Sequence, residues 1–434
     1  MTTTGSAYRP RLVDPLLTDA LATFAAVMVV GPRACGKTTT AARAATQIDR
    51  LDVPDTASRY RADPDAALRH AARPLLIDEW QEVPEVLGAV KRAVDRDRTP
   101  GQFLLTGSIR ATSELATWAG TGRVIRLALH PLTEREIRGT AVGDDLITRL
   151  THHWLDAIPP TLPELDLDAY VGLAVRGAFP ETALVERTAR QRRLWLDSYL
   201  DDLVTRDMAS IGSARDPVRL RRYLTALALN LAGQPTDASL IHDASINAKT
   251  AAAYDRALTN LAVLDTAPAW ASNRLKRLTR AGKRYLVDTG LAAAAADVDL
   301  PDIVGVSDLR GRWIDAFAAV QLRAELASAT PRRTMYHLRV EGGRREVDLL
   351  VDLGRGRVFA IEVKAGSAPT RDDARHLIWL RDELGADFVG GLLLHTGRAV
   401  TELDHRVAAA PLSALWSLPT PTPHQGLVPP FTTG

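Results

Sequence analysis

The feature that most constrains this chain is the octet Gly31-Pro-Arg-Ala-Cys-Gly36-Lys37-Thr38, which matches G-x-x-x-x-G-K-T in full. The apolar run Val27–Val30 precedes it and a helical pattern follows, which is the context that the motif requires. Its glycines allow a tight turn that aims backbone N–H groups at phosphate oxygens, and the helix N-terminus adds its positive dipole end. We therefore expect a phosphate-binding loop made of Gly31, Pro32, Arg33, Ala34, Cys35, Gly36, Lys37, Thr38 and Thr39.

Acidic and hydroxyl residues complete this nucleotide site in the sequence. Lys37 is expected to reach the β- and γ-phosphates, and the Thr38 hydroxyl to bind Mg²⁺. The apolar run Leu75–Ile77 ends in Asp78 and Glu79, where Asp78 would complete the Mg²⁺ ligands and Glu79 would activate the attacking water. Thr106 ends a third run and is expected to sense the γ-phosphate. The pattern predicts that the protein binds ATP with Mg²⁺ and hydrolyses it. In the alternative interpretation, Glu79 is a switch residue and ATP is not hydrolysed.

Strand-like and helix-like segments alternate through the first third of the chain. Apolar runs are found at 25–30, 75–77, 103–105 and 124–127, and helical patterns at 37–47, 64–72 and 84–97. Such alternation favours a parallel sheet with crossover helices. We assign residues 1–141 to an α/β P-loop NTPase domain.

The rest of the chain divides by composition and periodicity. Residues 142–168 hold a proline-rich stretch that predicts a linker or exposed loop. Residues 169–235 read as helical, and residues 236–296 have the layout of a winged helix. Residues 305–418 read as a second α/β domain, and the proline-rich tail 419–434 is expected to be disordered.

A basic cluster lies in the predicted wing. Residues 273–284 carry six basic side chains and no acid: Arg274, Lys276, Arg277, Arg280, Lys283 and Arg284. Such a patch suits phosphate contacts more than base reading, which predicts DNA binding with low sequence specificity and leaves RNA open. An inter-domain hinge whose charges meet acids of neighbouring domains is the alternative interpretation.

Composition indicates the cellular compartment and shows that lysine is rare in this chain. Net charge is +2, so only a local basic surface could attract nucleic acid. One cysteine and the absence of an apolar signal core predict a cytoplasmic protein with no membrane span. Only six of the 54 basic residues are lysine, so each lysine calls for a reason.

The order of parts resembles a widespread prokaryotic family of uncharacterised AAA-like P-loop ATPases with a C-terminal domain of unknown function. The matching stretches are His130–Glu136, Gly177–Glu181, Tyr199–Asp207, Tyr285–Leu291, Glu346–Asp348 and Ile361–Lys364. The resemblance covers nearly the whole chain. It implies an ATPase carrying a winged helix and a PD-(D/E)XK nuclease-like, or restriction-endonuclease-like, module.

Asp348, Glu362 and Lys364 fit the D-x(13)-E-x-K pattern of that nuclease-like module. Glu362 and Lys364 are two residues apart on a predicted strand, so both side chains share one face. The two carboxylates are expected to hold Mg²⁺, and Lys364 to orient water or neutralise developing charge. The family usually has glutamate where this chain has Asp315, a shorter side chain, which favours a structural module that has lost cleavage as the alternative.

The sequence thus leads to a nucleic-acid-associated ATPase, with DNA processing or defence as its setting. A nucleotide-controlled regulatory or protein-interaction switch with an inactive nuclease-like domain is the first alternative, and a transcriptional regulator the second. Oligomeric state and target do not follow from the sequence.

Overall fold

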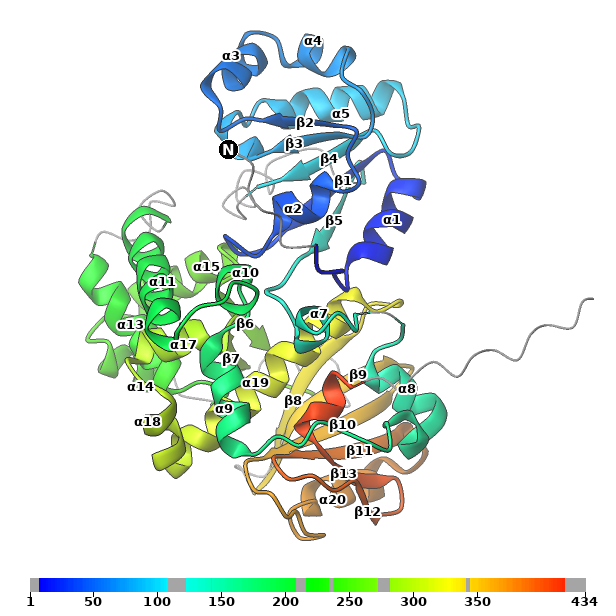
Figure 1. The fold of residues 1–434 in the computed structure, drawn as a ribbon, viewed down its shortest axis with the longest axis vertical. Helices are drawn as coiled ribbons and strands as arrows, with labels where there is room; N and C mark the ends of the chain where they lie inside the picture. The colour runs from blue at the N-terminus through cyan, green and yellow to red at the C-terminus, as the bar shows by residue number, and fades with distance from the viewer. Residues whose placement is uncertain are drawn as a thin grey trace, which may run out of the picture.

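A computed structural model describes residues 8–107, 122–141, 143–207, 216–233, 237–271, 282–340 and 344–417. Three units follow one another along the chain (Figure 1). We call them the N-terminal unit (8–128), the helical unit (146–305) and the C-terminal sheet unit (307–416).

The N-terminal unit is a parallel sheet between helices. Its five strands pair in the order β2-β3-β4-β1-β5, with every neighbouring pair parallel. Buried apolar side chains occupy both faces of β1, β3 and β4, as expected for strands covered on two sides. Its elements are α1 (Asp14–Thr23), β1 (Ala26–Val30), α2 (Lys37–Ala42), β2 (Gln47–Arg50), α3 (Pro54–Ala62), α4 (Pro64–Arg69), β3 (Leu75–Asp78), α5 (Val86–Arg96), β4 (Phe103–Thr106) and β5 (Val124–Ala128).

The predicted strands of this unit are all present, but β2 was missed. The predicted helix 37–47 ends five residues early, and Gln47 begins β2 instead. The β2 sequence Gln-Ile-Asp-Arg has a single apolar residue, Ile48, and its side chain is exposed. An edge strand of this composition carries no apolar periodicity, so sequence pattern alone does not reveal it.

The helical unit contains short helices and one small sheet. The strands β6 and β7 pair antiparallel. The winged helix over residues 236–296 stays a prediction. The predicted linker 142–168 is wrong in part, because α8 lies within it and buries Leu146, Ile147 and Leu150 in the core. The elements are α8 (Leu146–His153), α9 (Leu167–Arg176), α10 (Pro180–Ala183), α11 (Ala189–Asp202), α13 (Pro217–Leu229), α14 (Asp237–Asp243), α15 (Ala248–Asn260), β6 (Leu264–Ala267), β7 (Lys283–Leu286), α17 (Thr289–Ala296) and α18 (Leu300–Gly305).

The C-terminal sheet unit has a six-stranded mixed sheet in the order β12-β13-β11-β10-β9-β8. The long helix α19 packs against β10 and β8, and α20 packs against β9, β10 and β11. Gly354 and Gly356 both have positive φ in the turn between β9 and β10, where the hairpin was expected. The elements are α19 (Ser307–Ser328), β8 (Thr334–Val340), β9 (Arg345–Gly354), β10 (Arg357–Lys364), α20 (Arg375–Leu384), β11 (Phe388–His395), β12 (Thr401–Asp404) and β13 (Val407–Pro411).

One apolar core joins the helical unit to the C-terminal sheet unit. It runs from Leu146 of α8 through Trp313 of α19 to Leu349, Phe359 and Trp416. The N-terminal unit has cores of its own. The short helix α7 (Glu134–Ile137) lies between the N-terminal unit and the rest (Figure 1).

Candidate functional site

The glycine loop between β1 and α2 has the geometry that phosphate binding needs. Gly36 has φ +99°, a conformation that favours glycine, at the N-terminus of α2. A Cβ at Gly31 would lie 2.1 Å from the Leu129 carbonyl oxygen, so only glycine fits there. Two positions of the motif are therefore fixed by backbone geometry.

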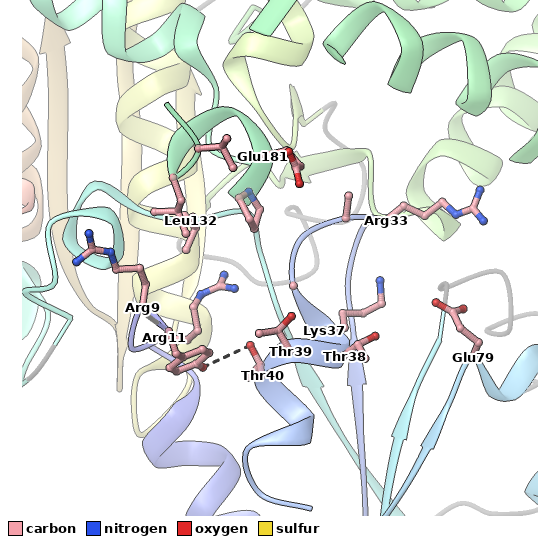
Figure 2. A pocket seen from close by; sticks show the side chains of 16 residues that line it. Arg9, Arg11, Arg33, Lys37, Thr38, Thr39, Thr40, Glu79, Leu132 and Glu181 are labelled. Carbon is pink, nitrogen blue, oxygen red and sulfur yellow. Dashed lines mark hydrogen bonds between the residues drawn. The ribbon is translucent and has the colours of Figure 1, made fainter. Parts of the chain in front are cut away.

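Lys37 lines a cavity of about 530 Å³ beside this loop (Figure 2). Its Nζ donates to the carbonyl oxygens of Gly31, at 3.1 Å, and Pro32, at 2.8 Å. Both acceptors are neutral, so the ammonium charge has no carboxylate partner in these bonds. It is available to an anion that enters the cavity.

Asp78 connects the glycine loop to the ends of two strands. The Thr38 hydroxyl donates to Asp78 Oδ1 at 2.8 Å, and the Thr106 hydroxyl donates to the same oxygen. A hydroxyl and a carboxylate side by side are oxygen ligands of the kind Mg²⁺ prefers, so Thr38 and Asp78 fit that ion. Thr106 orients Asp78, a role that the sequence did not indicate, and its contact with the γ-phosphate stays a prediction.

Glu79 points toward Lys37 and Thr38 from the end of β3 (Figure 2). Its φ of +52° is unusual for a residue with a side chain. Gln81, which sequence reasoning missed, donates from Nε2 to Glu79 Oε2. The amide thus fixes a carboxylate that lies at the cavity wall.

The opposite wall comes from outside the glycine loop. Tyr8 and Arg11 contribute from the N-terminal segment, and Pro180, Glu181 and Leu184 from α10 and its C-terminal end. Figure 2 labels Arg11 and Glu181 among these residues. The helical unit therefore forms part of the nucleotide-sized cavity. Sequence reasoning missed these residues; the matching stretch Gly177–Glu181 was the one signal that pointed to α10.

Arg11 connects the glycine loop to α7. It is buried, and its guanidinium donates to Glu136 Oε1 at 2.9 Å and to the Cys35 carbonyl at 3.0 Å. Glu136 also closes the capping box of α7 with Thr133, which fixes its carboxylate. The Arg11 side chain therefore connects the glycine loop to α7 through hydrogen bonds to both.

The first two residues of α7 contact the other two units. The Glu134 backbone N–H donates to Gln321 Oε1 of α19 at 2.7 Å, and its carboxylate pairs with Arg176 of α9. Arg135 pairs with Glu325 of α19 at 2.6 Å, and both side chains are buried. Burial raises the pKa of Glu325 to about 7 against the opposing effect of Arg135.

Cys35 lies fully buried behind the loop, with Sγ 3.6 Å from the Leu129 carbonyl. Burial raises the pKa of its thiol, and this outweighs the nearby Lys37 and Arg11. Its position before α2 therefore does not activate it. The interpretation as a packing residue agrees with this environment.

The structure brings Asp348, Glu362 and Lys364 together on β9 and β10. Lys364 Nζ lies 2.7 Å from Glu362 Oε1, and the Val363 N–H donates to Asp348 Oδ2 at 3.0 Å. Burial and the neighbouring Asp348 raise the pKa of Glu362 to about 8, against the opposing effect of Lys364. The predicted convergence of these three residues is therefore present.

Lys283 occupies the same cluster, which corrects its predicted place on a nucleic-acid-binding wing. Its side chain is 2% exposed, and Nζ lies 3.1 Å from both Asp315 Oδ2 and Asp348 Oδ1. In the β strand, Lys283 shares a face with the buried Tyr285, and this period-two signal was missed. Within the described residues, no group of three or more histidine, cysteine, aspartate or glutamate side chains is arranged to hold a metal ion. With the Lys283 ammonium between Asp315 and Asp348, the residues present do not fit the Mg²⁺ predicted here.

The remaining basic residues of the predicted wing give no support to a nucleic-acid surface. Arg284 is partly buried and pairs with Asp255 of α15 at 3.1 Å, an acid of its own unit. Lys283, whose partners belong to the C-terminal sheet unit, is the residue that agrees with the hinge interpretation. Arg274, Lys276, Arg277 and Arg280 lie outside the described residues.

Three family models match separate parts of the chain. An AAA domain matches residues 23–138, and two models described as Domain of unknown function, DUF8612 and DUF4143, match residues 167–302 and 310–415. The N-terminal unit is an AAA-type, P-loop ATPase-like domain. The match covers the glycine loop, Asp78, Glu79 and Thr106 of this domain.

Two curated relatives are similar to most of this chain. Both are uncharacterized proteins, one of Mycobacterium bovis and one of Mycobacterium tuberculosis. Each is 29% identical over 351 residues, which cover 79% of this chain and 71% of the relative. Their names give no activity.

Two solved structures show weaker similarity, each at 12% identity. A Walker-type ATPase of Pyrococcus abyssi aligns with 65% of this chain and 94% of its own, with a TM-score of 0.39. A Vibrio cholerae protein aligns with 90% of this chain and 95% of its own, with a TM-score of 0.19. Because these scores are low, the ATPase-like assignment rests on the AAA match and on the geometry of the glycine loop.

The described helices were also compared with what a bilayer requires. None of them combines the length and the apolar character needed to cross one.

Proposed function

We propose that this protein is an ATPase whose nucleotide state controls the contact between its AAA-type domain and the two following units. The observation that carries the proposal is the cavity in which Lys37, Thr38 and Glu79 face residues of α10. A nucleotide in that cavity would touch both the AAA-type domain and the helical unit.

The catalytic roles follow from the positions of the side chains. The N–H groups of the glycine loop and Lys37 would bind the β- and γ-phosphates. Thr38 and Asp78 would hold Mg²⁺, which when bound neutralises phosphate charge. Glu79, held by Gln81, would accept a proton from the water that attacks the γ-phosphorus, and ADP and inorganic phosphate would leave.

The contacts of Arg11 and α7 support the control of the other units. Arg11 touches the carbonyl of Cys35 within the loop, and α7 contacts α9 and α19 through Glu134 and Arg135. A change of loop conformation on phosphate binding would alter the Arg11–Glu136 pair. That change would reach the shared core of the helical and C-terminal sheet units.

Of the functions considered from the sequence, the regulatory switch agrees best with these contacts. The Lys283 position argues against a metal-dependent nuclease, and the described residues supply no exposed basic surface from the predicted wing. DNA or RNA binding through Arg274, Lys276, Arg277 and Arg280 stays a prediction.

The test compares wild type with Glu79→Gln in the full-length protein. We expect Glu79→Gln to bind ATP with unchanged affinity while phosphate release falls by about 10²-fold, the scale of losing a general base. Amide hydrogen exchange in α7 and α10 should slow when ATP binds to Glu79→Gln and recover with ADP. Equal turnover in the two proteins would reject Glu79 as the base, and unchanged exchange would reject the coupling.

A further inference from the structure

The buried charge cluster of the C-terminal sheet unit includes a residue from the helical unit. Lys283 lies on β7 opposite Ala267 of β6, yet its ammonium reaches Asp315 of α19 and Asp348 of β9. Glu346 Oε1 lies 3.7 Å from the same nitrogen. One cation therefore faces three carboxylates supplied by two elements of another unit.

The cluster also holds carboxylate oxygens with no partner. Asp315 Oδ1 and Glu362 Oε2 are buried and accept no hydrogen bond within the described residues, while their residues are only 8% and 5% exposed. Buried oxygens of this kind are costly unless a cation or donor faces them. The site thus has more carboxyl oxygens than its two lysines contact.

Lys283 remains charged in this environment. Burial opposes the ammonium form, but Asp315 and Asp348 outweigh it and raise the pKa of Lys283 well above its ordinary value. Nearly complete burial and two contacts at 3.1 Å leave the nitrogen little room to share the position with another cation.

We propose that Lys283 is a built-in cation that occupies a latent divalent-metal site between Asp315 and Asp348 and excludes Mg²⁺ or Mn²⁺ from it. The ammonium supplies the positive charge that a metal ion would supply to the same oxygens. The site becomes a metal site only when the Lys283 side chain leaves it.

The position of the lysine makes this exclusion depend on how two units pack. The chain after β6 is joined to the C-terminal sheet: the Trp270 N–H donates to the His337 carbonyl at 2.7 Å, and the His337 N–H donates to the Pro268 carbonyl at 3.0 Å. A movement of β6 and β7 away from β8 would therefore carry Lys283 away from the two carboxylates. This inference does not depend on ATP hydrolysis, so it stands or falls separately from the proposed function.

The decisive experiment measures Mn²⁺ binding to the full-length, nucleotide-free protein by electron paramagnetic resonance. The variant Lys283→Met keeps an unbranched side chain that is one atom shorter, so it removes the charge and the atom that occupies the cation position. We expect it to bind one more Mn²⁺ per chain than wild type, which should show no Mn²⁺ binding that depends on Asp348. The double variant Lys283→Met, Asp348→Asn should lose this ion, while Mn²⁺ at Thr38 and Asp78 is common to all three proteins.

Two results would overturn the proposal. One is a folded Lys283→Met protein, shown by its circular dichroism and cooperative melting, that gains no Mn²⁺. The other is wild-type protein that already binds Mn²⁺ in a way that Asp348→Asn abolishes.

If Lys283→Met does not fold, chemical acetylation of the lysines of the wild-type protein tests the proposal instead. Mass spectrometry should show Lys283 protected in the native protein while the exposed Lys249 reacts, and 10-fold excess Mn²⁺ should leave that protection unchanged. Acetylation of Lys283 at the rate of Lys249, or its exposure by Mn²⁺, would show that the ammonium does not hold the position.

Discussion

Lysines lie in both the glycine-loop site and the Asp348 cluster of a chain that has only six, but Lys37 and Lys283 have different kinds of partner. Lys37 donates to two neutral carbonyl oxygens beside a cavity of about 530 Å³. Lys283 is enclosed by carboxylates and is 2% exposed. The first charge can serve a ligand, whereas the second is already neutralised by the protein.

This difference separates a binding lysine from a structural one. When a phosphate binds, the Lys37 ammonium can leave the two carbonyl oxygens at small cost, because the carbonyls carry no net charge that would stay buried and unpaired. Removing an ammonium from buried carboxylates leaves them uncompensated, which is strongly unfavourable. A scarce lysine therefore has a different role in each site: Lys37 can bind a ligand, and Lys283 stabilises the protein.

The largest effect should follow removal of the binding lysine. Lys37→Ala should reduce ATP turnover by at least about 10²–10³-fold, because it removes a positive donor aimed at the transferred phosphate. Phosphate release measures this, with Lys249→Ala, at an exposed lysine, as the matched control. Turnover equal to wild type would place ATP hydrolysis outside the glycine loop.

Removal of the enclosed lysine should act on stability. Lys283→Met should lower the free energy of unfolding by about 3–5 kcal/mol, the usual result of breaking a buried ion pair from one side. Urea unfolding of the full-length chain measures this, and Lys249→Met should change stability by less than about 0.5 kcal/mol. Equal stability of the two variants would mean that the Asp315–Lys283–Asp348 contacts contribute nothing net.

A smaller effect concerns the pH dependence of stability. Burial raises the pKa of Glu362 to about 8, so between pH 5 and 8 the native state keeps a proton that the unfolded chain releases. Stability therefore falls as pH rises through that window, and Asp315, whose pKa burial raises to about 7, acts in the same direction.

Glu362→Gln should flatten this dependence, because an amide has no proton to release. We expect the loss of stability between pH 5 and 8 to shrink by about 1 kcal/mol or more relative to wild type. Urea unfolding at the two pH values measures the change. An identical slope in the variant would show that Glu362 is ionised in the native state throughout the window.

Much of both sites followed from local pattern. The glycine loop, the acidic end of β3 and the β9–β10 hairpin are set by neighbouring residues, because turn glycines and strand alternation act over a few positions. Gln81 and the edge strand β2 were not predicted from the sequence, since neither has a periodic signal. The helix α8 within the predicted linker did have such a signal, because Leu146, Ile147 and Leu150 follow the capping Asp145 at helical spacing, and it was missed beside the proline-rich stretch.

The sequence by itself determined that a phosphate-binding loop precedes α2 and that Glu362 and Lys364 share a strand face. Only the tertiary structure decided that α10 faces that loop, that Arg11 reaches Glu136, and that Lys283 lies against Asp315 and Asp348. Motif residues lie within a few positions of one another, so local backbone geometry places them. The contacts of Arg11 and Lys283 join residues 32 to 125 positions apart, and α10 lies still further along the chain from the loop, so packing of whole units brings these groups together.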